Sequence, residues 1–326
     1  MAEITYLQAI NDAMREEMER DPSVFLLGED VGHYGGAFKV TKGLLDKFGE
    51  ERVIDTPISE SAIAGAAIGA AITGMRPIAE MQFADFITVA FNQLVSNAAT
   101  MHYRFGIPVP MVVRAPSGGR IHGGPFHSKN PEAWFAHQPG LKVVAPATVY
   151  DAKGLLKSAI RDNNPVIYFE HKYYYRRLKQ EIDEDKEILV PLGQANIVKS
   201  GDDLTIITYG GTLHMCIEAA EQAEKEDGLD VQVMDLRTLA PLDKSAILES
   251  VRKTSRVVIV HEDDLTGGIG GEVAAIIAQE GFEYLDAPVR RVASIDTPTP
   301  YSPVLEQVYY PNVSDILNVV RETAAF

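Results

Sequence analysis

Short apolar runs alternate along the chain with longer segments in which apolar residues return every three or four positions. The first long segment predicts a helix over residues 6–19, because Leu7, Ile10, Met14 and Met18 share one helical face. The apolar runs that predict buried strands in the first half are residues 23–31, 52–57, 76–82, 110–116, 141–147 and 165–171. The segments between them that predict helices include residues 86–105, 131–140 and 148–163. Buried strands that alternate with helices predict a parallel α/β sheet.

This alternation stops at a charged segment, residues 172–191, which has no aliphatic periodicity until Ile188. The pattern begins again with the strand-like run at residues 203–210 and continues to the closing helix. We therefore expect two parallel-sheet α/β domains, residues 1–185 and residues 186–326.

Composition narrows the function classes. The 326 residues carry a formal net charge of −16, which argues against binding nucleic acid or an anionic membrane. The small-residue run at residues 61–75 is too short and too weakly apolar to span a bilayer, and the first residues lack the pattern of a signal peptide. The single cysteine, Cys216, allows no intramolecular disulfide, which fits a reducing, cytoplasmic location.

A carboxylate stands at an unusual place in the segment Asp55–Phe86. Glu60 lies where polar sequence gives way to a run of Ala, Gly and Ile, and Ser59 before it is the expected N-cap of a helix. Burial beside apolar neighbours is costly for a carboxylate that has no partner. The pattern therefore raises the question of what Glu60 binds.

Two histidines share a glycine-rich loop. His122 and His127 lie in residues 117–129, directly after an expected strand. Ligands bind to loops at strand ends in α/β sheets, and an imidazole suits acid–base chemistry near neutral pH. From the residues alone, a histidine that only hydrogen-bonds its loop neighbours is an equally good interpretation.

The end of the helix at residues 148–163 is polar. Asp162, Asn163 and Asn164 favour turn chemistry at a helix end. The free carbonyl groups, the carboxylate and the amide also suit a hard cation such as K⁺.

Seven motifs occur in an order that resembles one protein family. They are "FLLGEDVG", "GLLDKFGEERVIDTPISE", "AIAGAAIGAAITGMRPIAEMQFADF", "FHSKNPEAWFAHQPGLKVVAP", "YDAKGLLKSAIRDNNPVIYFEHK", "TIITYG" and "VMDLRTLAPLD". Together they are similar to the beta subunit of the thiamine-diphosphate-dependent, decarboxylating first component of 2-oxo acid dehydrogenase complexes. The resemblance covers about residues 6–326.

The resemblance implies a fold, an activity and partners. The fold would be a thiamine-diphosphate pyrimidine-binding domain followed by a transketolase C-terminal-like domain. The activity would be that of an oxidoreductase acting on an oxo group with a disulfide acceptor. The partners would be an alpha subunit in an alpha-2 beta-2 heterotetramer, a second beta subunit and a dihydrolipoyl acyltransferase core.

The resemblance also implies site residues. Glu60 would bind the pyrimidine nitrogen N1′ of the cofactor, with Ile58, Gln82 and Phe86 as further contacts on the pyrimidine side. His127 would act in acyl transfer to a lipoyl arm. A structural potassium ion would be held by the positions that match the family's metal ligands, which are Val112, Ala159, Ile160, Asp162 and Asn164.

One expected motif is missing. The Gly-Asp-Gly…Asn sequence that holds Mg²⁺ and the diphosphate occurs in the family's alpha subunit, and it does not occur in this chain. The chain would therefore supply half of a cofactor site. Lys129 stands where the family usually has Gln, which is a departure on the substrate side.

Several functions remain open at this point. The motifs "AEMQFADF" and "HSKNPEAWFAHQPG" favour a branched-chain 2-oxo acid, and pyruvate or acetoin enzymes share most of the same motifs. An alternative is a mainly non-catalytic module that docks an alpha subunit to the acyltransferase core. The presence of both Glu60 and His127 favours catalysis.

Overall fold

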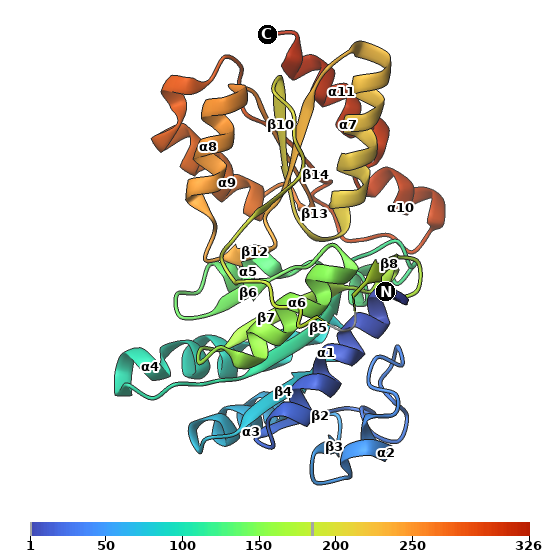
Figure 1. The fold of residues 1–326 in the computed structure, drawn as a ribbon, viewed down its shortest axis with the longest axis vertical. Helices are drawn as coiled ribbons and strands as arrows, with labels where there is room; N and C mark the ends of the chain where they lie inside the picture. Colours follow the sequence, from blue (N-terminus) through green and yellow to red (C-terminus); the bar gives the residue numbers. More distant parts are fainter. Residues whose placement is uncertain (1, 184–185) are drawn as a thin grey trace. The chain divides into compact units, whose positions relative to one another are not determined.

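The computed structural model describes residues 2–183 and 186–326, and the chain divides into two compact units (Figure 1). The first unit comprises the chain up to Ser117 and Trp134–Leu192, and the second comprises Gly118–Ala133 and Gly193–Phe326. Residue 185, where the first expected domain ends, lies outside the described residues. Ile188 and Val190 belong to the buried core of the first unit, so the charged segment ends inside that unit.

The first part of the chain follows the predicted alternation of strands and helices (Figure 1). Its elements, in order, are β1 (Ala2–Thr5), α1 (Tyr6–Arg20), β2 (Val24–Gly28), α2 (Leu44–Phe48), β3 (Val53–Asp55), α3 (Glu60–Ile72), β4 (Arg76–Glu80), η1 (Ala84–Ala90), η2 (Gln93–Ala98), α4 (Ala99–Phe105), β5 (Val112–Ser117), η3 (Gly124–Phe126), α5 (Glu132–Ala136), β6 (Lys142–Val144), α6 (Val149–Arg161), β7 (Val166–His171), η4 (Lys172–Tyr174) and β8 (Lys179–Ile182).

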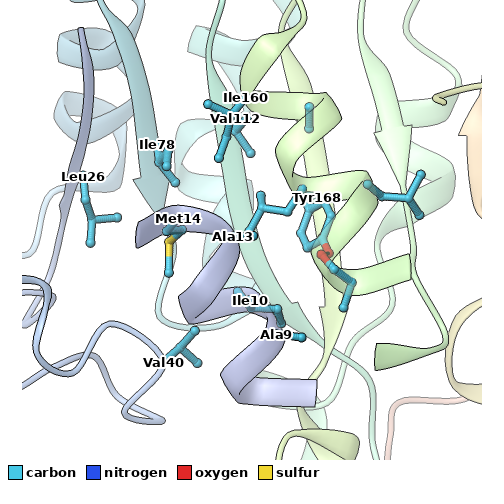
Figure 2. Packing of buried hydrophobic residues seen from close by; sticks show 14 of the residues in the cluster. Ala9, Ile10, Ala13, Met14, Leu26, Val40, Ile78, Val112, Ile160 and Tyr168 are labelled. Atoms are coloured by element: carbon cyan, nitrogen blue, oxygen red, sulfur yellow. Dashed lines mark hydrogen bonds between the residues drawn. The ribbon is translucent and has the colours of Figure 1, made fainter. Parts of the chain in front are cut away.

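The main sheet of the first unit is parallel and runs in the order β6, β7, β5, β4, β2, β3. Helices α1 and α6 pack against each other and against one face of this sheet. Figure 2 shows Met14 of α1 beside Leu26 and Ile78 of the strands, with Ile10 and Ala9 further along the same helix. Fully buried strands explain why their sequences read as continuous apolar runs.

A small antiparallel sheet in the first unit was not predicted. β1 pairs with β8, so that Thr5 lies opposite Lys179 and Ile4 opposite Gln180. Both strands are short and polar, and they form strands only because they pair with each other from distant positions in the sequence. Thr5 then caps helix α1 in a capping box with Gln8.

The second unit is a second α/β sheet with the order β14, β13, β10, β11, β9. Its elements are β9 (Asn196–Lys199), β10 (Leu204–Thr208), η5 (Gly210–Thr212), α7 (Leu213–Asp227), β11 (Val231–Asp235), β12 (Thr238–Ala240), α8 (Lys244–Thr254), β13 (Val257–Asp264), α9 (Ile269–Glu280), η6 (Phe282–Tyr284), β14 (Arg290–Ser294), α10 (Pro303–Tyr309) and α11 (Val313–Ala324). The prediction of two α/β domains is confirmed, with one correction. β9 pairs antiparallel with β11, so this sheet is mixed.

Another expectation needs correction. Residues 86–105 were predicted as one helix, and the structure divides this region into the 3-10 helix η1, the π-helix η2 and the α-helix α4. The short helix α10 was not predicted. In the part of the chain that the structure describes, none of the helices combines the length and the apolar character that crossing a bilayer requires.

A buried arginine connects three neighbouring strands of the first sheet. Arg114 of β5 is fully buried and donates to Glu80 of β4 through Nη1 and to Glu170 of β7 through Nη2. Burial raises the pKa of Glu170 to about 7, against the opposing effect of Arg114. Burial also raises the pKa of Glu80. Three buried charged groups in contact stabilise a fold only while all three are present.

We predict that Arg114→Met lowers the free energy of unfolding by about 3–5 kcal/mol at pH 8, because two buried carboxylates then lose their cation. The raised pKa of Glu170 means that the folded chain takes up a proton as the pH falls through about 7. The loss should therefore be smaller at pH 5.5, where Glu170 is protonated. Urea unfolding at both pH values measures it.

The exposed Arg104→Met is the matched control and should change little at either pH. An equal loss for Arg114→Met at pH 5.5 and pH 8 would contradict the electrostatic explanation.

Candidate active site

Three parallel strands of the first unit end level with one another. Gly28 at the end of β2 lies opposite both Asp55 of β3 and Glu80 of β4. Because the carboxyl ends of parallel strands share one edge of a sheet, the segments that follow them are neighbours. Those segments carry all four residues predicted to contact the pyrimidine, which are Ile58, Glu60, Gln82 and Phe86.

Glu60 is the first residue of helix α3 and is only 9% exposed. The next residue, Ser61, donates from its hydroxyl to the carbonyl of Val89 at 2.6 Å, which ties the start of α3 to η1. No hydrogen bond joins the Glu60 carboxyl group to another residue that the structure describes. This carboxyl group is therefore held in place by its helix and remains available to a ligand.

Glu29 is a second buried carboxylate at the same edge, and the sequence analysis missed it. It follows β2 directly and is 5% exposed. Burial raises the pKa of Glu29, and the charge of Glu60 raises it further, while a hydrogen bond from the backbone N–H of Ser59 opposes both. The atom Oε1 of Glu29 is buried and has no hydrogen-bond partner among the described residues. Its signal was a carboxylate immediately after an apolar strand.

Glu29 also changes the interpretation of Ser59. Ser59 occupies the N-cap position as expected, but its hydroxyl donates to the carbonyl of Pro57 and does not cap the helix. Its backbone N–H instead meets the Glu29 carboxylate. A negative charge near a helix start is favourable, which offsets part of the cost of burying Glu29.

The other three predicted residues differ in exposure. The side chain of Ile58 is 83% exposed. Gln82 is half-buried, and its amide donates to the carboxylate of Asp30 at 3.3 Å. The ring of Phe86 packs edge-on against Phe83, with the ring centres 5.8 Å apart. The edge thus presents carboxyl groups, an amide and an aromatic ring.

His127 belongs to the second unit. It follows the 3-10 turn η3, and its backbone N–H donates to the carbonyl of Gly124. Its side chain is half-buried, and the neighbouring Ser128 is buried. Lys129 lies two residues further, and its carbonyl accepts from Gly118, which closes the base of the loop.

The five residues predicted to bind potassium lie at the opposite edge of the first sheet. Val112 is the first residue of β5 and lies opposite Val166, the first residue of β7. Ala159 and Ile160 end helix α6, and Asp162 caps it. The structure therefore brings the predicted ligands to the amino ends of the strands, away from the edge that holds Glu60.

Two cations of the protein already bind these oxygens. Nη1 of Arg76 donates to the carbonyls of Ile160 at 2.9 Å and Asp162 at 3.0 Å. Lys142 and Asn164 both donate to the Asp162 carboxylate. Burial alone would raise the pKa of Asp162, but these bonds outweigh it and hold that pKa below its usual range.

As arranged, these residues do not fit a potassium ion, because it would compete with Arg76 and Lys142 for the same oxygens. In the ranges that the structure covers, no group of three or more His, Cys, Asp or Glu side chains is arranged to hold a metal ion.

Comparison with protein families matches both units of the chain. Residues 2–177 match the pyrimidine binding domain of transketolase, and residues 193–316 match the transketolase C-terminal domain. These two matches identify the two halves of the predicted fold.

Curated relatives match over the whole chain. The 2-oxoisovalerate dehydrogenase subunit beta of Bacillus subtilis (strain 168) is 54% identical over 329 residues, which is 100% of each chain. The pyruvate dehydrogenase E1 component subunit beta of Chaetosphaeridium globosum is 46% identical over 99% of this chain and 98% of its own. The corresponding subunit of Staphylococcus epidermidis (strain ATCC 12228 / FDA PCI 1200) is 44% identical over the full length of both chains.

A solved structure, "Split gene transketolase, inactive beta4 tetramer", has the same fold. It superposes with a TM-score of 0.79 over 99% of this chain and 98% of its own, at 24% sequence identity.

We predict that Glu29→Gln makes the chain relatively more stable as the pH rises. The pKa of Glu29 is raised in the folded chain, so folding favours the protonated form. The contribution of Glu29 to the free energy of unfolding therefore falls as the pH rises above the pKa that this group has in the unfolded chain. Glutamine has no such loss. The difference in thermal midpoint between variant and wild type should therefore be more positive at pH 8 than at pH 4.5.

The exposed Glu50→Gln serves as the matched control and should show no such trend. If both variants follow the same pH dependence, Glu29 is not the group responsible.

We predict that Arg76→Met destabilises the end of α6, because two backbone carbonyls lose their donor. A loss of about 1–3 kcal/mol is typical when buried acceptors lose a charged partner. In the variant, KCl should restore more of the thermal midpoint than NaCl does, because K⁺ can then reach the freed oxygens. Wild-type protein should respond equally to both salts.

Arg104→Met controls for the loss of a positive charge. A stabilisation of wild type that is specific to KCl would show that potassium binds beside Arg76.

Proposed function

Because this chain belongs to the beta subunits of the decarboxylating first component of 2-oxo acid dehydrogenase complexes, we propose that it works with an alpha subunit in an alpha-2 beta-2 heterotetramer. Together they would decarboxylate a 2-oxo acid with thiamine diphosphate and pass the acyl group to a lipoyl arm of a dihydrolipoyl acyltransferase core. The observation that carries the proposal is the buried, unbonded carboxyl group of Glu60 beside Glu29, at the edge that also bears Gln82 and Phe86.

The residues at this edge fit the pyrimidine half of thiamine diphosphate. When bound, the cofactor supplies a nucleophilic carbon and an electron sink for the decarboxylation. Glu60 would hold a proton between its carboxyl oxygen and the pyrimidine nitrogen N1′. Its position in the first turn of α3 fixes the direction of that hydrogen bond, and its low exposure keeps water from competing for it.

Three further residues would orient the same ring. Phe86 would pack on the pyrimidine, and Phe83 holds its ring in place. Gln82 offers an amide that Asp30 already orients. Ile58 would contribute mainly through its backbone, because its side chain is largely exposed.

Glu29 would be the carboxyl neighbour of Glu60 at this site. Burial raises the pKa of Glu29, and the charge of Glu60 raises it further. A carboxyl group that takes up a proton more readily than usual would thus stand beside Glu60.

His127 would act in the transfer of the acyl group. In that step the disulfide of the lipoyl ring breaks, one sulfur takes the acyl group and the other becomes a thiol. His127 would deliver the proton that this thiol needs, and its partly exposed position in a loop suits a donor that meets a large mobile substrate.

We propose a branched-chain 2-oxo acid as the substrate. The identity to the 2-oxoisovalerate dehydrogenase subunit is 54%, against 44% and 46% for the pyruvate dehydrogenase subunits described above. Mg²⁺ and the diphosphate would be held mainly by the alpha subunit, because the chain lacks the motif for them. The cytoplasm is the proposed location, in keeping with the buried free thiol of Cys216.

We predict that Glu60→Gln, assembled with the alpha subunit, loses decarboxylation by at least about 100-fold, the usual loss when a positioned acid–base group is removed. Release of CO₂ measures it. Glu50→Gln, an exposed change of the same kind, should retain full activity. Wild-type turnover by Glu60→Gln would remove this carboxyl group from the mechanism.

The substrate is tested on the assembled protein with 3-methyl-2-oxobutanoate, pyruvate and acetoin. We expect the highest kcat/KM with 3-methyl-2-oxobutanoate. Thiamine diphosphate should bind tightly only when both subunits are present, and tight binding by this chain alone would contradict the half-site. Full assembly without turnover of any of the three compounds would favour a docking role.

A further inference from the structure

The loop that carries His127 has an unusual backbone. Arg120 and His122 have φ angles of 63° and 60°, which is the left-handed region that residues other than glycine rarely adopt. Gly118 and Gly124 also have positive φ angles. Such a loop keeps its shape only where other groups hold it.

Glu306 of helix α10 holds the middle of this loop. Its Oε1 accepts from the backbone N–H of Arg120 at 3.0 Å and of His122 at 3.3 Å. Its Oε2 lies 2.6 Å from Nδ1 of His122. Glu306 is 3% exposed, so hydrogen bonds from the loop replace the hydrogen bonds that water would make to this carboxylate.

Glu262 of strand β13 holds both ends of the loop. Its Oε1 accepts from the backbone N–H of Gly119 at 2.8 Å and from the side-chain amide of Asn130 at 3.2 Å. Its Oε2 accepts from Nε of Arg120 at 3.3 Å. This carboxylate is also buried, and it comes from a different element than Glu306.

Tyr310 contacts the loop through both its hydroxyl group and its ring. Its hydroxyl donates to the carbonyl of Ser128 at 3.1 Å, and the guanidinium of Arg120 lies over its ring. A Cβ atom at Gly119 would come within 1.9 Å of the Tyr310 hydroxyl. The loop therefore has no room to move towards this ring, and glycine is required at position 119.

We propose that Glu262 and Glu306 are positioning residues for acyl transfer. They fix residues 119, 120, 122 and 130, and His127 lies between the last two of these points. Fixing the backbone on both sides of His127 would set where its imidazole meets the lipoyl sulfur. This inference rests on the role of His127 under the proposed function, and it adds two residues that would act through the backbone of the loop.

The alternative is that the two carboxylates only stabilise the second unit. A stabilising role would lower every activity of the assembled enzyme together. A positioning role lowers acyl transfer and leaves decarboxylation unchanged, because Glu60 belongs to the other unit.

The test uses the complete alpha–beta assembly with Glu306→Ala, Glu306→Gln and the exposed control Glu283→Ala. Decarboxylation is followed with a dye as the electron acceptor, and acyl transfer is followed with an isolated lipoyl domain. We expect Glu306→Ala to lower kcat for acyl transfer about 10- to 100-fold, the cost of a misplaced catalytic group. Dye-linked decarboxylation should remain near wild type. Glu306→Gln should recover most of the transfer, because its amide oxygen still accepts from both N–H groups.

Two further variants keep the test decisive. Gly119→Ala displaces the loop without changing either carboxylate, and it should give the same selective loss even if Glu306→Ala does not assemble. Hydrogen exchange at Arg120 and His122 should become faster in Glu306→Ala. Equal losses in both assays, or no loss of transfer in Glu306→Ala and Gly119→Ala, would overturn the inference.

His127→Ala separates this inference from the proposed function. If it lowers acyl transfer and the loop variants do not, only the positioning role fails. If His127→Ala leaves acyl transfer unchanged, the proposed role of His127 fails and the positioning role fails with it.

Discussion

The contact of Arg114 with Glu80 and Glu170 is the interaction on which the first unit depends. These residues come from β5, β4 and β7, three adjacent parallel strands, and they meet inside the protein near the carboxyl ends of the strands. Two buried carboxylates with one guanidinium leave a net negative charge unless one carboxyl group is protonated, and the pKa of Glu170, raised by burial to about 7, permits this. The loop after β2 also approaches this cluster, because a Cβ atom at Gly36 would lie 3.2 Å from Oε1 of Glu80. The edge that presents Glu29 and Glu60 is therefore built on buried charge as well as on apolar packing.

Apolar periodicity was sufficient for the central strands and the long helices, because burial on both faces leaves a continuous apolar run. It failed where pairing depends on distant partners. β1 and β8 are polar and short, and their pairing joins residues 2–5 to residues 179–182, which are far apart in the sequence. The region 86–105 reads as one helix, but the structure changes its winding twice, at η1 and η2. The hydroxyl of Ser61 binds the carbonyl of Val89 there, a tertiary contact that local propensity does not contain.

In the candidate site, too, some features could be predicted from the sequence and others depend on the fold. Ile58, Glu60, Gln82 and Phe86 were named together only through the family resemblance, and the structure places the segments that carry them at one edge, since parallel strands end on the same side. Their chemical roles came from family resemblance, because a carboxylate before a small-residue helix has no unique function. Glu29 was within reach of the same argument, as it follows β2 directly. The binding of Arg76 to the end of α6 was not, because Arg76 and Ile160 are 84 positions apart and only the fold brings them together.

The loop of His127 shows most clearly why local sequence was insufficient. A left-handed conformation at a residue other than glycine costs about 1–2 kcal/mol, and the loop has two such residues, Arg120 and His122. A hydrogen bond to a charged group contributes about 1.5–3 kcal/mol, and the backbone of this loop donates three of them to buried carboxylates. The carboxylates therefore outweigh the strain. They lie 143 and 186 positions further along the chain than their partners Gly119 and Arg120. The conformation of the loop is thus determined by β13 and α10. A change in either element would therefore alter the position of His127, which belongs to the same unit, more than the position of Glu60.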